Sequence, residues 1–282
     1  MLVGVGRAGN VGRPAAGTRR ALLDFRAAMP ASVTYSRTGG ATGLTAAGVL
    51  TAFAANAPQR TDRGLALEPA RTNKVSVFNA NPTDLTGASK GGDATATLEL
   101  VDDTAALTAA GLLGVCPSGN VYRLDNTAGT GSATVLFSDT TGDLSAHSVS
   151  FYARAVRSAG AENLRPGLYA SANTTVVSAS FSGLAQYQRL AVENITPTAT
   201  TNRCGIRCEP GTTAWFILPQ LEAGATARSV IVTEGAQATR SLPVCSVVVP
   251  AGRTQARLSY ADGTTTTTSG LLAGTTFDIA GA

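Results

Sequence analysis

The stretch SVSFYARA (Ser148–Ala155) indicates the fold class of this chain. Small or polar residues alternate along it with apolar ones, and VSASFS (Val177–Ser182) repeats the pattern. Successive side chains of a β-strand point to opposite faces, so this alternation predicts strands with one buried face.

Similar segments recur about every dozen residues between Val75 and Val244, with Gly, Asn, Asp or Pro between them. The predicted strands are Thr95–Val101, Val121–Asp125, Ala133–Ser138, His147–Val156, Leu164–Ala170, Val176–Ser182, Tyr187–Val192, Arg203–Cys208 and Thr213–Leu218. Regular spacing of short strands is typical of a β-sandwich, and this number of strands suits a jelly roll. We therefore expect an all-β protein whose residues 75–244 form a jelly-roll β-sandwich, with a helical turn within Asp103–Gly114.

Three further segments flank the predicted sandwich. Residues 1–20 are rich in Gly and Arg and predict an extended arm, and residues 21–74 predict a connector of short strands, too small to hold its own core. Residues 245–282 predict a small β-meander with a hairpin turn at Asp262–Gly263. Because an isolated meander of this size is marginal in water, we expect other subunits or the jelly roll to complete it.

The composition favours association with other proteins. Charged residues make up 14% of the chain, against about 25% in typical soluble domains, and Gly, Thr, Ser and Ala are abundant. A β-rich protein with so little surface charge is expected to form a homo-oligomer. The net charge of +4 is dispersed except in the arm. Arg7, Arg13, Arg19 and Arg20 lie there, with no acidic residue before Asp24.

We expect the arm to dock on an acidic partner surface rather than on nucleic acid, because no aromatic stacking residues are interleaved with its arginines. No apolar run reaches the roughly 18 residues that span a bilayer, so no membrane insertion is expected. The start of the chain lacks the long apolar region of a signal peptide, so synthesis in the cytoplasm without export by that route is expected.

A second stretch, LALEPARTN (Leu65–Asn73), resembles the "IEPARTN" signature of structural proteins of tailed bacteriophages, where it precedes a carbohydrate-binding-like jelly roll. Further blocks resemble the same family in the same order: LLDFRAAMPASVTYSRTGGATGL (Leu22–Leu44), GVLTAFAANAPQR (Gly48–Arg60), SVSFYARA (Ser148–Ala155), AQYQRLAVE (Ala185–Glu193) and PQLEAGATARSVIVTEGAQATR (Pro219–Arg240). The chain departs from the family pattern at Ser229–Val230, where Ser–Tyr is usual, at Tyr187, where Trp is usual, and at Arg37–Gly40, where Arg–Ala–Ser is usual. Any family binding site that used those aromatic side chains is therefore altered here.

The resemblance implies a virion protein, either a head fibre, a head spike or a tail-associated protein, made in the host cytoplasm. Its arm would anchor it to capsid or tail proteins. Its jelly roll would adsorb to host cell-surface polysaccharide through weak contacts multiplied by copy number. A trimer is expected, or a pentamer at a capsid vertex. Two alternatives stay open: a capsule depolymerase, and a structural adaptor without a ligand.

No catalytic residue is predicted. His147 is the only histidine and opens a predicted strand, and the motifs of serine hydrolases, zinc proteases and nucleotide-binding loops are absent. A glycosidase would need two facing carboxylates, and the sequence does not pair any of the candidates. These are Glu99, Asp102, Asp103, Asp139, Asp143, Glu162, Glu193 and Glu222, of which Glu222 is interpreted as structural.

Sugar binding would need aromatic platforms, and the candidates are Tyr152, Tyr169, Tyr187 and Trp215. Trp215 and Phe216 are adjacent, so one of them points into the sandwich and the other out. The core position is favoured for Trp215, which leaves Tyr169 and Tyr187 as the better surface candidates.

No cofactor is predicted, although a structural calcium with Asp102, Asp103 and Asp139 as oxygen ligands is conceivable. A zinc site would need a second close pair of cysteines, and the chain has none. Cys116, Cys204, Cys208 and Cys245 are expected to be free, buried thiols. In a strand, Cys204 and Cys208 would lie about 13 Å apart, too far for a disulfide, whereas pairing of either with Cys116 or Cys245 stays open.

Overall fold

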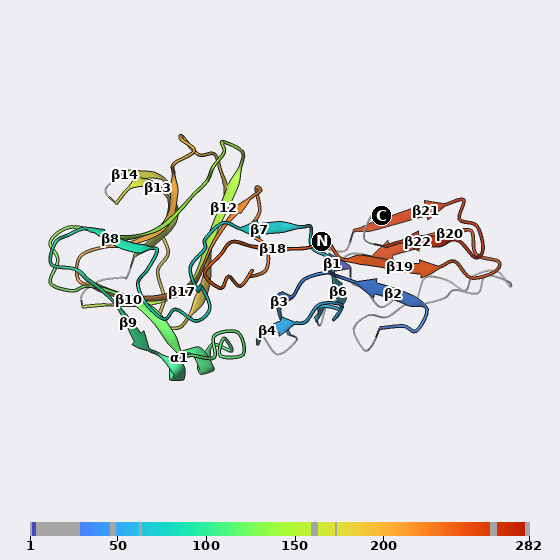
Figure 1. Cartoon of the computed structure of the whole chain (residues 1–282), viewed down its shortest axis with the longest axis horizontal. Helices are drawn as coiled ribbons and strands as arrows, with labels where there is room; N and C mark the ends of the chain where they lie inside the picture. The colour runs from blue at the N-terminus through green and yellow to red at the C-terminus, as the bar shows by residue number, and fades with distance from the viewer. Residues whose placement is uncertain are drawn as a thin grey trace. The chain divides into compact units, whose positions relative to one another are not determined.

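The computed structural model describes residues 2–3, 29–45, 49–61, 64–158, 163–172, 174–259 and 264–279 (Figure 1). The chain divides into two compact units. The sandwich unit consists of Val49–Thr51 and Arg71–Arg240. The terminal unit consists of Met1–Gly48, Ala52–Ala70 and Ser241–Ala282. The predicted anchoring residues Arg7, Arg13, Arg19 and Arg20 lie outside the described residues.

The sandwich unit is an antiparallel jelly roll, as the sequence predicts, with a seven-stranded and a five-stranded sheet. Five strands form the main order of the seven-stranded sheet, and two short strands, β7 (Arg71–Asn73) and β18 (Ala238–Arg240), extend it. The sheet that we call the β12 sheet has the order β15 (Gln188–Ile195), β12 (His147–Arg157), β17 (Thr212–Ala223), β10 (Asn120–Asn126) and β9 (Thr97–Asp102). The β16 sheet has the order β14 (Thr174–Ser178), β13 (Leu164–Ser171), β16 (Arg203–Cys208), β11 (Ala133–Thr140) and β8 (Ala88–Gly92). The order β10-β17-β12-β15 in one sheet and β11-β16-β13-β14 in the other is that of a jelly roll.

The core of the sandwich follows from the alternation in the sequence. Val149, Phe151 and Ala153 of β12 are fully buried and point into one cluster with apolar residues of both sheets. Aromatic rings fill its centre, where Tyr122 stacks on Phe216 with ring centroids 5.5 Å apart. Burial of such rings supplies much of the stability of a sandwich of this size.

Each predicted strand of the sandwich overlaps an observed one, but β14 ends at Ser178, within the predicted strand Val176–Ser182, and the structure adds strands at the margins. β8 was not predicted, since its sequence ASKGG has neither alternation nor β-branched residues. β17 continues to Ala223 beyond a bulge at Leu218, whose φ of 56° interrupts the pattern. The predicted helical turn is α1 (Thr104–Ala109). No helix in the described ranges is long and apolar enough to cross a membrane.

The sandwich unit begins earlier than predicted. β7 (Arg71–Asn73) pairs with the end of β17 and with β18 (Ala238–Arg240), so the last residues of the LALEPARTN stretch belong to this unit. Its bounds, Arg71 and Arg240, lie close to the predicted bounds, 75 and 244.

The terminal unit combines the predicted connector with the predicted tail. β2 (Val33–Ser36) pairs with β19 (Val244–Val248), which also pairs with β22 (Thr276–Asp278). The other strands of this unit are β1 (Leu2–Val3), β6 (Gly64–Ala66) and β5 (Arg60–Thr61) in one sheet, and the pair β20 (Gln255–Ser259) with β21 (Thr265–Ser269). β3 (Ala41–Leu44) pairs with β4 (Leu50–Phe53), of which Ala52 and Phe53 belong to this unit. The connector of the same chain therefore supplies a strand partner for the tail that the sequence did not predict, and completion of the tail by other subunits stays a prediction.

The prediction of free, buried thiols is confirmed. Cys116, Cys204, Cys208 and Cys245 are all buried and unpaired. Burial raises the pKa of the thiols of Cys116, Cys208 and Cys245 to about 12.

Candidate functional site

A row of polar and aromatic side chains crosses the outer face of the β12 sheet. Arg154 of β12 is paired with Trp215 of β17, Trp215 with Arg123 of β10, and Arg123 with Glu99 of β9. Tyr187, immediately before β15, lies at the other end, with the Arg154 guanidinium 5.7 Å from its ring centroid. We call these five residues the cross-strand ladder.

Trp215 stands on the outer face because its neighbour Phe216 takes the inward position. Phe216 has no exposed surface and packs among the core aromatic rings, whereas Trp215 is only partly buried. The prediction that Trp215 fills the sandwich core is therefore wrong. The alternation correctly placed the two rings on opposite faces, but it did not say which face was which.

Arg154 is held against Trp215 by Asp103. The guanidinium carbon lies 3.8 Å from the indole centroid, and Nε and Nη2 donate to the two carboxylate oxygens of Asp103 at 2.7 and 3.0 Å. The Tyr187 hydroxyl donates to the same carboxylate at 2.7 Å. Asp103 precedes α1 but makes no side-chain capping bond to it, so its carboxylate serves the ladder.

Arg123 holds the exposed end of the ladder. Its Nη1 donates to Glu99 at 2.7 Å and its Nη2 to Asp125 at 2.6 Å, and its guanidinium lies 5.9 Å from the Trp215 centroid. The side chains become more exposed along the row, from 17% for Arg154 to 33% for Arg123 and 47% for Glu99. A ligand from solution would therefore reach the ladder at its β9–β10 end.

Tyr152 and Tyr187 are less accessible than surface binding would require. Both belong to an apolar cluster that includes Leu107 of α1, Leu112 and Ile217 beside the ladder. Only 8% of Tyr152 and 7% of Tyr187 are exposed. Burial, together with the hydrogen bond to Asp103, raises the pKa of Tyr187, so its hydroxyl stays protonated and supports Asp103.

Tyr169 is not a surface platform in this structure. It lies on the outer face of the β16 sheet but has no exposed surface. Its ring lies against Gly205, where a Cβ would be 3.1 Å from the ring, and the Arg207 guanidinium lies 5.5 Å from its centroid. Its hydroxyl donates to the carbonyl of Arg165.

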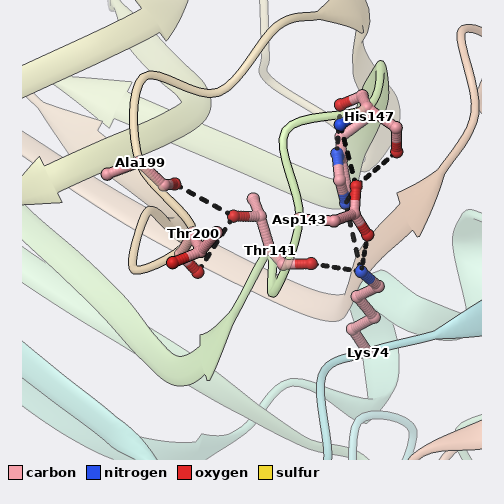
Figure 2. Close-up of polar contacts among 7 residues, drawn as sticks. Lys74, Thr141, Asp143, His147, Ala199 and Thr200 are labelled. Atoms are coloured by element: carbon pink, nitrogen blue, oxygen red, sulfur yellow. Dashed lines mark hydrogen bonds and ion pairs between the residues drawn. The ribbon is translucent and has the colours of Figure 1, made fainter.

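A second polar cluster surrounds the start of β12 (Figure 2). Lys74 Nζ donates to Asp143 at 3.0 Å and to the Thr141 carbonyl, and lies 3.2 Å from His147 Nε2. His147 Nδ1 is 2.7 Å from the Ser145 carbonyl, so Nδ1 carries the proton and Nε2 accepts from Lys74. The His147 side chain has no exposed surface. This cluster holds a loop against the sheet, and its most exposed charged group is the Asp143 carboxylate, whose side chain is 49% exposed.

The blocks that resemble phage proteins meet in a buried polar network. The Asn73 amide donates to the carbonyls of Pro219 and Ile231, both at 3.1 Å, and its carbonyl accepts from the backbone of Val75 and Leu221, both at 3.1 Å. These bonds tie the LALEPARTN stretch to the PQLEAG stretch. Backbone groups buried at such a junction need partners, and Asn73 supplies four of them.

Gln220, Glu222 and Arg240 complete this network. Gln220 accepts from the Ile231 backbone at 2.7 Å, and Glu222 accepts from Gln220 at 2.5 Å and from the Arg228 backbone at 3.2 Å. Arg240 donates to the Ser229 carbonyl at 2.9 Å. Burial raises the pKa of Glu222, whose side chain lies under this segment. The geometry agrees with the structural interpretation of Glu222.

The remaining candidate carboxylates are engaged within the fold. Asp102 accepts from the Thr104 backbone at 2.8 Å, and Asp139 accepts from the Ser76 backbone at 2.8 Å. With Asp103 bound to Arg154, the three conceivable calcium ligands have separate partners. In the part of the chain that the structure describes, no group of three or more His, Cys, Asp or Glu side chains could hold a metal ion. Glu162 lies outside that part.

The ladder combines two predicted platforms, Trp215 and Tyr187, and one candidate carboxylate, Glu99, with two arginines that the sequence did not predict as part of a site. Arg123, Arg154 and Asp125 were missed because only strand pairing brings them together. The sequence did contain one indication of these residues. Each is the chain neighbour of an apolar residue that points into the core (Tyr122, Leu124 or Ala153), so each must point outward from its strand.

Comparison with known proteins gives fold-level likenesses only. No protein-family model matches the chain, and no curated protein matches it. Among solved structures, the chain is similar to an arabinose-bound GH51 α-L-arabinofuranosidase (TM-score 0.40, 14% identity, 67% of this chain and 31% of that one). It is also similar to the enzymatically active domain of tailspike protein 4 of bacteriophage CBA120 (TM-score 0.37, 14% identity, 55% of this chain and 21% of that one). A third likeness is to the CBM22-1 xylan-binding domain of Xyn10C from Paenibacillus barcinonensis (TM-score 0.36, 9% identity, 57% of this chain and 100% of that one). The chain thus spans about a third of the arabinofuranosidase.

Proposed function

We propose that this protein is a non-enzymatic structural component of a phage-like particle, and that its sandwich unit adsorbs to host cell-surface polysaccharide through the cross-strand ladder. The observation that carries the sugar-binding part is the partly exposed indole of Trp215, held among guanidinium and carboxylate groups on the outer face of the β12 sheet. The ordered blocks that resemble phage structural proteins support the particle part.

The ladder has the chemistry that sugar recognition requires. The exposed part of the indole offers apolar surface to the C–H groups of a pyranose ring. Glu99 and Asp125 accept hydrogen bonds from sugar hydroxyls, and Arg123 donates to them. One such site binds weakly, but a homo-oligomer, proposed to be a trimer, multiplies the contacts on a polymer that presents repeated sugars.

Attachment to the particle is assigned to the N-terminal arm in this proposal. Arg7, Arg13, Arg19 and Arg20 would pair with acidic groups of capsid or tail proteins. Immunogold labelling of particles from the producing host tests this part: gold on vertices or on tails supports it, and particles without any label contradict it.

The chain contains a single tryptophan, so the fluorescence of Trp215 reports directly on the ladder. We expect soluble surface polysaccharide to change this fluorescence in a saturable way. W215A should bind at least about tenfold more weakly, equivalent to about 1.4 kcal/mol, when retention is measured by affinity electrophoresis.

The matched control is F78A, which removes another aromatic side chain, 45% exposed, from the sandwich unit. It should leave retention unchanged. Equal retention of W215A and the wild type would contradict the assignment of binding to the ladder. Release of reducing ends from the polysaccharide would contradict the non-enzymatic part and favour a depolymerase.

A further inference from the structure

We infer that the cross-strand ladder selects uncharged polysaccharide and disfavours glycans that carry carboxylate, sulfate or phosphate groups. This inference rests on the proposed function, because it names the ligand class of the same site.

The positive charges of the ladder are already matched by carboxylates. Arg154 forms a bidentate ion pair with Asp103, and Arg123 forms ion pairs with both Glu99 and Asp125. Two guanidiniums thus face three carboxylates. A site that binds an acidic sugar needs a cation with unsatisfied charge, and this site instead has an excess of negative charge.

The relative exposure of the charged side chains also disfavours an anionic sugar. The Glu99 side chain is 47% exposed and is the most exposed charged group of the ladder, whereas Arg123 is 33% and Asp125 is 22% exposed. An anionic sugar that approaches from the open β9–β10 end would meet the Glu99 carboxylate first. To reach Arg123 it would have to place a further negative charge beside Glu99 and Asp125, and the repulsion between these like charges disfavours its binding.

Neutral hydroxyls meet no such barrier. Of the five N–H groups of a guanidinium, Arg123 uses one on Glu99 and one on Asp125, and carboxylate oxygens accept more than one hydrogen bond each. A sugar hydroxyl can therefore donate to Glu99 while a neighbouring hydroxyl accepts from Arg123. The ion pairs are kept, and the ligand adds to them.

The outer face of the β16 sheet has the opposite character and provides the control. Arg165 and Arg207 lie opposite each other on β13 and β16, and Arg203 lies on the same face. Arg165 lies 3.6 Å from a Glu209 carboxylate oxygen, whereas Arg207 donates to the neutral groups Thr134 Oγ1 and Ala172 carbonyl. If this protein binds acidic glycans, Arg203 and Arg207 are the better receptor.

The test uses the full chain and pairs of matched probes: galactan, xylan, mannan and glucan, each with its carboxymethylated derivative. Trp215 fluorescence and retention in affinity electrophoresis are measured for each pair. We expect at least one neutral polymer to bind and its carboxymethylated form to bind about tenfold more weakly or worse. E99Q should reduce this preference, and E99K should abolish or reverse it. R203Q, on the other sheet, should leave both affinities unchanged.

The outcomes separate the inference from the proposed function. Equal or tighter binding of the carboxymethylated polymers, or loss of binding in R203Q, would overturn the inference while sugar binding itself stands. If no polymer of either kind alters Trp215 fluorescence or is retained, the proposed function fails, and the inference fails with it.

Discussion

Glu222 shows how a single side chain can serve architecture at a cost in stability. It is 1% exposed, and its Oε2 has no hydrogen-bond partner among the described residues. Burial raises its pKa above the ordinary value of 4.5, although hydrogen bonds and nearby arginines act in the opposite direction. A group whose pKa is raised on folding stabilises the fold below its ordinary pKa, and this contribution is lost as the pH rises through the raised value.

We therefore expect E222Q to gain stability relative to the wild type as the pH rises from about 4 to about 7. The glutamine keeps an oxygen for Gln220 and for the Arg228 backbone, but carries no charge that must be buried. A tenfold change in proton affinity on folding corresponds to about 1.4 kcal/mol. Urea unfolding followed by Trp215 fluorescence at both pH values measures the difference.

The control is E234Q at an exposed position, which gives the baseline effect of removing one carboxylate from the surface. A pH-independent difference between E222Q and the wild type would show that the Glu222 carboxylate ionises as readily in the folded chain as in the unfolded one.

At the residue scale, the sequence alone shows which neighbouring side chains lie on opposite faces of a strand, but not which of the two faces is buried in the core. Alternation correctly separates Trp215 from Phe216, and it cannot tell that Phe216 completes the stack on Tyr122. Similarly, nothing near Tyr169 in the sequence shows that Gly205, on the neighbouring strand, leaves room for its ring. Both errors arise because a pattern within one strand has no information about the partner strand.

Within the elements, β16 is shaped by a glycine whose missing side chain lets another strand's aromatic ring approach. A Cβ at Gly205 would lie 2.6 Å from the Val135 carbonyl oxygen and 2.7 Å from Leu136 Cδ2. Real Cβ atoms do not approach so closely, so the sheet would have to shift.

We expect G205A to lower the free energy of unfolding by about 1–3 kcal/mol, the usual cost of overpacking a well-packed site. G131A is the matched control, because its Cβ would make an ordinary contact of 3.5 Å with Asp93. Urea unfolding of both variants checks this prediction, and equal stability of the two would contradict the steric account of Gly205.

The strands themselves were largely predictable, and their pairing was not. Segments such as His147–Arg157 can be recognised as strands from the sequence, because the side chains that face the common core are apolar and occur at alternate positions. The pairing of β2 with β19 joins residues about 200 positions apart, and no local pattern encodes such a contact. The ladder was missed for the same reason, since its members come from separate strands.

At the scale of the whole molecule, each of the two units contains one or more cysteine side chains of its own, whose accessibility reports on whether that unit is folded. Cys245 is buried in the core of the terminal unit, with Leu65 and Phe277, whereas the other three cysteines and Trp215 lie in the sandwich unit. The stability of each unit can therefore be followed separately in the intact chain.

We expect F277A to expose Cys245 to alkylation under native conditions while Cys116, Cys204 and Cys208 stay protected. Loss of a buried phenylalanine costs about 3–5 kcal/mol, a large fraction of the stability of a small unit. Mass spectrometry after a pulse of iodoacetamide counts the modified thiols. L272A, which removes a side chain that is 69% exposed in the same unit, should leave all four thiols protected. Simultaneous labelling of all four in F277A would mean that the units unfold together.

The burial of all four thiols bears on the redox environments in which the chain keeps its fold. Because all four sulfur atoms are buried and unpaired, the fold depends on no cross-link that a reducing compartment would break. An oxidising medium likewise finds no accessible thiolate to attack. The chain should therefore keep one covalent structure on both sides of a cell boundary, and its maturation should need no thiol oxidase or isomerase.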